Sequence, residues 1–158
     1  MFNLKNGTSF KEYMKNKTDE HIEVFNKTEV SNETKNKIKS LKEKRVVLAF
    51  SEGYCKDCTV SIPFIEKLVQ ENENIELTIY PREGNEAFLD EALGEAKIPT
   101  VLVFDGNMEP LGAYVEFPEE LKEKVEKSNL EEKRLIISDY RKGMYNNLIE
   151  KELLKILK

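Results

Sequence analysis

Short apolar segments alternate with amphipathic stretches between about residues 46 and 127. Val46–Phe50 is a continuous apolar run rich in β-branched residues, which is typical of a buried strand. Cys55–Glu71 repeats apolar residues at helical spacing, whereas Ile75–Tyr80 alternates with period two as a strand does. This order predicts a strand–helix–strand unit with two parallel strands and a right-handed crossover.

The second half of this region continues the same pattern. Glu86–Leu93 predicts a short helix, and Thr100–Phe104 predicts a further strand. A turn signal at Asp105–Asn107 leads into a strand at Gly112–Glu116, which predicts an antiparallel hairpin. Pro118 suits the first position of a following helix, where its missing N–H is not needed. These elements predict an α/β fold in which helices flank a central mixed β-sheet.

Polar sequence with isolated apolar positions flanks this region on both sides. Before it, Ser9, Thr18 and Ser31 are expected to cap three short helices, and Ser9 with Glu12 matches a capping box. After it, Gly143 separates two further helical stretches. We therefore divide the chain into an N-terminal helical extension at 1–44, a core at 45–128, and C-terminal helices packed on the core at 129–158.

The charge balance of the 158-residue sequence narrows the classes of function. Lys plus Arg number 25 and Asp plus Glu 30, and a net charge of -5 argues against phosphate-backbone binding, which draws on a basic excess. The basic residues at 35–45 fit a solvated helix face, because no aromatic residue interleaves with them. The longest apolar run is far shorter than the roughly 20 residues that cross a bilayer, and no secretory signal is visible. We expect a cytoplasmic protein without nucleic-acid or membrane partners.

Cys55 and Cys58 are the only cysteines, and two residues separate them. A structural zinc site needs four Cys or His ligands, and with His21 as the only histidine one chain cannot complete that shell. A structural disulfide at this spacing closes a very short loop and removes little chain entropy. A redox dithiol at a strand–helix junction is the interpretation that we favour, with zinc in a shared dimer site and a structural disulfide as alternatives.

The expected position of the pair assigns each thiol a role. Cys55, at the start of a helix, faces unpaired backbone N–H groups and the positive end of the helix dipole, and both favour the thiolate. Cys58 lies three residues on, along the same face and deeper, within disulfide reach. We expect Cys55 to attack a target disulfide and Cys58 to break the resulting mixed disulfide, which leaves a reduced target and an oxidised pair.

Three further residues stand at informative distances from this pair. Tyr54 directly precedes Cys55, Pro63 lies five residues after Cys58, and Pro99 lies just ahead of a predicted strand. Together with the strand order and the hairpin, this pattern resembles the thioredoxin superfamily over about residues 46–127. In that family an aromatic residue, a helix-kinking proline and a cis-proline occupy these places. The flanks resemble those of bacterial thioredoxin-like proteins with an N-terminal helical extension.

The resemblance implies a thioredoxin-like fold and a thiol–disulfide oxidoreductase that reduces or exchanges protein disulfides. Its site would comprise the catalytic pair Cys55 and Cys58, the substrate-binding residues Tyr54, Ile98, Pro99 and Thr100, and the neighbouring Lys56, Asp57 and Pro63. It implies no metal and no cofactor besides the redox-active disulfide. The implied partners are protein disulfide substrates and an upstream reductase. The alternative function is a redox-sensing or partner-binding module without efficient turnover.

The sequence also departs from the family pattern. Lys56 and Asp57 replace the Gly-Pro pair of thioredoxins, and Ala49 stands where the family has a buried acid that assists proton transfer at the second cysteine. Glu52, Asp57 and Tyr54 are nearby alternatives for that assistance, although solvation or packing is the better explanation of each of them. Lys56 should lower the pKa of Cys55 and Asp57 should raise it, and the sequence does not fix the net sign.

Overall fold

Residues 2–158 are described by the computed structural model. Four strands form one mixed sheet in the order β2-β1-β3-β4. β1 (Arg45–Phe50) pairs in parallel with β2 (Ile75–Tyr80) and antiparallel with β3 (Thr100–Asp105). β3 in turn pairs antiparallel with β4 (Pro110–Val115). The predicted α/β class, the parallel strand pair and the hairpin are confirmed.

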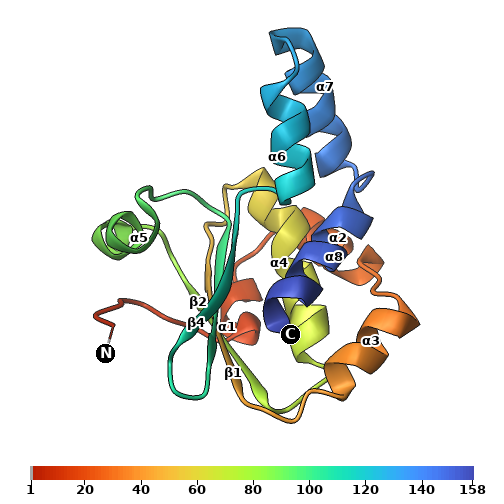
Figure 1. Cartoon of the computed structure of the whole chain (residues 1–158). Helices are drawn as coiled ribbons and strands as arrows, with labels where there is room; N and C mark the ends of the chain where they lie inside the picture. Colours follow the sequence, from red (N-terminus) through yellow and green to blue (C-terminus); the bar gives the residue numbers. More distant parts are fainter. Residues whose placement is uncertain (1) are drawn as a thin grey trace.

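Helices cover both faces of this sheet (Figure 1). α4 and α8 lie on one face, α5 lies on the other, and α6 with α7 extends beyond the sheet. No helix among residues 2–158 combines the length and the apolar character needed to cross a membrane. The helices are α1 (Phe10–Met14), α2 (Asp19–Lys27), α3 (Asn32–Lys39), α4 (Lys56–Val69), α5 (Glu86–Leu93), α6 (Glu119–Glu126), α7 (Leu130–Arg141) and α8 (Asn146–Leu157).

The predicted caps of the first three helices are confirmed. Ser9, Thr18 and Ser31 each have extended backbone, and each side-chain oxygen accepts the backbone N–H three residues later. The predicted capping box at α1 is only half formed. The carboxylate of Glu12 pairs with Lys15 at 3.4 Å, so it is directed along the helix surface and not back to the cap.

Some predicted boundaries were wrong by a few residues. Pro118 is the N-cap of α6, because its ψ of 145° leaves it outside the helix. β4 begins at Pro110 and not at Gly112; a proline is tolerated there because β4 is an edge strand. α4 starts after Cys55, which is its N-cap, and ends at Val69.

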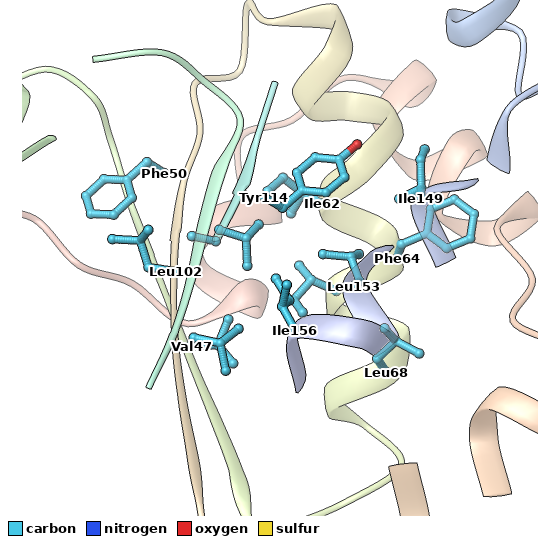
Figure 2. Packing of buried hydrophobic residues seen from close by; sticks show 14 of the residues in the cluster. Val47, Phe50, Ile62, Phe64, Leu68, Leu102, Tyr114, Ile149, Leu153 and Ile156 are labelled. Atoms are coloured by element: carbon cyan, nitrogen blue, oxygen red, sulfur yellow. The ribbon is translucent and has the colours of Figure 1, made fainter. Parts of the chain in front are cut away.

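The main core lies between the sheet and the pair of helices α4 and α8. Ile62 and Leu68 of α4, Leu153 of α8 and Val47 of β1 are at most 1% exposed and lie in the layer between the sheet and the two helices (Figure 2). α8 approaches β4 so closely that a Cβ atom on Gly112 would lie 2.8 Å from Ile156 Cγ2. The C-terminal helix is therefore part of the core and not an appendage.

The N-terminal segment is hydrogen-bonded to β2 at the edge of the sheet. The backbone of Thr8 exchanges two hydrogen bonds of 2.8 Å with Ile79 of β2. Gly7 is needed at this approach, because a Cβ atom there would lie 2.5 Å from a ring carbon of Tyr80. Phe10 then packs on Phe25 of α2, with ring centroids 5.0 Å apart. These contacts fix α1 against the core close to α4.

Candidate active site

The dithiol lies where β1 gives way to α4. Cys55 is the N-cap of α4, and its Sγ accepts the backbone N–H of Cys58 at 3.2 Å. The sequence placed Cys55 inside the first helical turn, whereas the cap position directs its sulfur at a free N–H of that turn. The helix therefore stabilises negative charge on Cys55 directly.

The two thiols have opposite surroundings. Cys55 is half-buried, whereas Cys58 is fully buried. Hydrogen bonds from the Cys58 thiol and from backbone N–H groups lower the pKa of Cys55, although burial and the charge of Asp57 oppose this. Burial and the neighbouring Cys55 thiolate raise the pKa of Cys58. At neutral pH the accessible sulfur is thus the better nucleophile, and the buried one holds its proton.

The Ile98-Pro99-Thr100 loop lies against this pair. The Ile98–Pro99 peptide bond is cis, and the Ile98 carbonyl oxygen is 3.9 Å from Cys55 Sγ. Pro99 accepts the N–H of Glu116 at 2.7 Å, and the buried Thr100 hydroxyl donates to a backbone carbonyl. The backbone N–H of Ile98 has no partner among residues 2–158. The backbone N–H of Ile98 is therefore available for a further hydrogen bond.

Tyr54 forms an exposed rim beside Cys55. Tyr54 is 71% exposed, and its hydroxyl accepts a hydrogen bond of 2.9 Å from Arg82. Glu52 is directed away from the thiols, since its carboxylate accepts the N–H of Glu83 at 3.0 Å. His21 of α2 holds the turn before Tyr54, because its ring Nε2 forms a hydrogen bond of 3.0 Å with the Gly53 carbonyl oxygen.

The two residues between the cysteines have different surroundings. Lys56 is exposed on the outer side of α4. Asp57 is bound by Arg141 of α7 through two bonds, of 2.9 and 3.3 Å. Sequence reasoning missed Arg141, because 84 residues separate the partners. Pro63 is buried within α4, and the helix continues through it.

Two hydroxyl groups behind Cys58 were also missed. Ser51, which follows β1, is 2% exposed, and its side chain lowers the pKa of Cys58 against the larger rise that burial causes. The hydroxyl of Tyr13 in α1 lies 2.6 Å from the same Ser51 oxygen. Burial raises the pKa of Tyr13 to about 12, so this phenol stays protonated at neutral pH. Ala49, at the place of the family's acid, is fully buried.

Within residues 2–158 no group of three or more His, Cys, Asp or Glu side chains is placed to hold an ion. The ring nitrogens of His21, the only histidine of the sequence, hydrogen-bond to the Thr18 hydroxyl and to the Gly53 carbonyl.

Comparison with known proteins places the chain in a family. A family model described as thioredoxin matches residues 7–133, and the chain therefore belongs to the thioredoxin family. The match includes the N-terminal helices as well as the sheet. No curated protein matches the sequence.

Two solved structures share the fold over nearly the whole chain. One is a Pseudomonas aeruginosa protein of unknown function, with a TM-score of 0.76, 20% identity, and coverage of 95% of this chain and 91% of that one. The other is an HIV epitope-scaffold with a TM-score of 0.75, also 20% identical, with 95% and 92% covered. At this identity the likeness concerns the fold alone.

Proposed function

We propose that this protein is a thiol–disulfide oxidoreductase that reduces or exchanges protein disulfides through Cys55 and Cys58. The observation that carries the proposal is the asymmetry of the pair: Cys55 Sγ caps α4 and is accessible, whereas Cys58 is buried directly behind it. A passive structural disulfide needs no such difference in acidity between its two sulfurs.

In the proposed reaction the Cys55 thiolate attacks one sulfur of a target disulfide. A Cys55–target disulfide forms, and the other target sulfur leaves as a thiolate that takes a proton from water. Cys58 then loses its proton and attacks Cys55 Sγ, which releases the second target sulfur and leaves the Cys55–Cys58 disulfide. An upstream reductase supplies two electrons to restore the dithiol, and no other cofactor takes part.

Substrate binding is proposed at the loop beside Cys55. The unpaired N–H of Ile98 can donate to an extended target backbone, while Pro99 and Thr100 shape the loop and Tyr54 provides an exposed aromatic surface. Lys56, Asp57 and Pro63 act by shaping α4 and its charge. We place this activity in the cytoplasm, where reductases keep thiols reduced.

Reduction of insulin with a dithiol as electron donor tests the activity. The wild-type protein should accelerate insulin precipitation, and Cys55→Ser should abolish it. Cys58→Ser should stop turnover but accumulate mixed disulfides through Cys55, because attack is intact and only resolution is lost. A wild-type protein that cycles between oxidised and reduced forms without reducing insulin would instead support a redox sensor.

A further inference from the structure

The resolving step requires the proton of a buried thiol to leave. Cys58 has no exposed surface, and burial together with the Cys55 thiolate disfavours its ionised form. No acidic side chain stands on β1 beside it, because the strand carries Ala49 at the family's acidic position. Some other group must stabilise the thiolate that attacks Cys55.

Two hydroxyl groups, those of Ser51 and Tyr13, lie in the neighbourhood of Cys58. Ser51 is buried and lowers the pKa of Cys58, and the Tyr13 hydroxyl lies 2.6 Å from Ser51 Oγ. Tyr13 and Cys58 also line one small cavity, together with further residues of α1, α2 and α4. Tyr13 itself is half-buried and belongs to α1, a helix without fully buried residues.

We propose that Ser51 and Tyr13 activate Cys58 for resolution, an inference that rests on the proposed function and deepens it. Ser51 is the catalytic group, because its O–H donates to the Cys58 sulfur as negative charge develops there. Tyr13 is a positioning residue: its O–H donates to Ser51 Oγ, which orients the Ser51 hydrogen toward the sulfur and polarises it. The Cys58 proton passes to water, the Cys58–Cys55 bond forms, and the Cys55–target bond breaks.

This arrangement gives the N-terminal helices a part in the chemistry. α1 is short, and it is held in place by the Thr8–Ile79 bridge and by the packing of Phe10 on Phe25. Those contacts keep the Tyr13 hydroxyl at Ser51. The extension thus supplies a polar group where the strand itself has none.

The two release phases of the aromatic disulfide 5,5′-dithiobis(2-nitrobenzoate) test the proposal with the full chain. Attack by Cys55 releases the first coloured thiolate, and resolution by Cys58 releases the second. The released thiolate needs no proton, so the pH dependence of the second phase reports the loss of the Cys58 proton.

We expect Ser51→Ala to slow the second phase about tenfold at pH 7, because a hydrogen bond to a charged group is lost, and to leave the first phase within about twofold. The pH at which the second phase accelerates should rise. Tyr13→Phe should shift it in the same direction with a smaller loss, about threefold, since it removes only the bond to Ser51. Tyr80→Phe is the matched control, as its hydroxyl has no hydrogen-bond partner among residues 2–158.

These outcomes distinguish a failure of the proposed Ser51 and Tyr13 roles from a failure of the proposed function. An unchanged second phase in both variants would overturn the role of Ser51 and Tyr13 and leave the proposed function intact. Equal slowing of both phases, with a lowered melting temperature, would also overturn it, because that result marks a structural role. A wild-type protein that releases only one equivalent would overturn the proposed function itself.

Discussion

The Asp57–Arg141 pair offers a sharp test of the electrostatics at Cys55. Asp57 follows Cys55 by two residues and raises its pKa through its charge, and Arg141 binds that charge at 2.9 and 3.3 Å. The hydrogen bond and the charge of Asp57 raise the pKa of the Arg141 guanidinium, and the charge of the Cys55 thiolate adds a smaller rise. Removing either partner should therefore move the pKa of Cys55, and in opposite directions.

Asp57→Asn removes the opposing charge and leaves Arg141 unpaired, so the pKa of Cys55 should fall. Arg141→Gln leaves Asp57 uncompensated, so it should rise. Arg141 is 42% exposed at its side chain, and water screens the interaction. Two unit charges at contact distance in such surroundings interact by about 1 kcal/mol or less, which changes the acid dissociation constant of Cys55 by roughly two- to fivefold.

The assay is thiolate absorbance at 240 nm followed against pH, with Cys58→Ser as the common background so that one thiol titrates. Lys39→Gln serves as the control, because Lys39 also belongs to a surface ion pair, with Glu71 at 3.4 Å, but stands on α3. Midpoints that move in the same direction for both variants, or that stay with the control, would falsify the assignment of Asp57 and Arg141 as opposing charges.

Three further changes test packing and burial. Gly112→Ala should destabilise the fold by about 1 to 3 kcal/mol in thermal denaturation, because its methyl group meets Ile156 at 2.8 Å; an unchanged melting temperature would show that α8 can shift freely. Leu153→Ala should cost about 2 to 5 kcal/mol in urea denaturation, whereas Leu135→Ala, at a residue that is 62% exposed, should cost under about 0.5; similar values would contradict the core position of α8. Burial raises the pKa of Glu66 from 4.5 to about 6, so stability should fall as pH rises through that interval, and Glu66→Gln should abolish the fall; the same slope in the variant would assign it to another group.

The elements of the fold were predictable because their signals are local. The period-two and helical patterns identified β1, α4 and β2 in order, and the turn at Asp105–Asn107 identified the hairpin. Errors occurred at the ends of elements, as at Pro118, where the backbone torsion decides and the residue type does not. Local sequence signals also predicted correctly that Cys55 and Cys58 lie at the start of a helix.

The surroundings of the dithiol were less predictable, because distant segments build them. Ser51 and Tyr13 are 38 residues apart, and Asp57 and Arg141 are 84 apart. Neither pair has a motif that links it in the sequence, and each depends on how the flanking helices dock. The sequence therefore named Asp57 but not the cation that compensates it.

The bridge between Thr8 and Ile79 also bears on how the protein avoids self-association. β2 is an edge strand, and an edge strand offers unpaired N–H and C=O groups to any other extended chain. Thr8 occupies both groups of Ile79, and the segment that carries it lies across this border of the sheet. The short segment before α1 thus protects the edge strand β2 from pairing with another molecule. Its removal would expose the hydrogen-bonding groups of Ile79 to the edge strand of a second molecule.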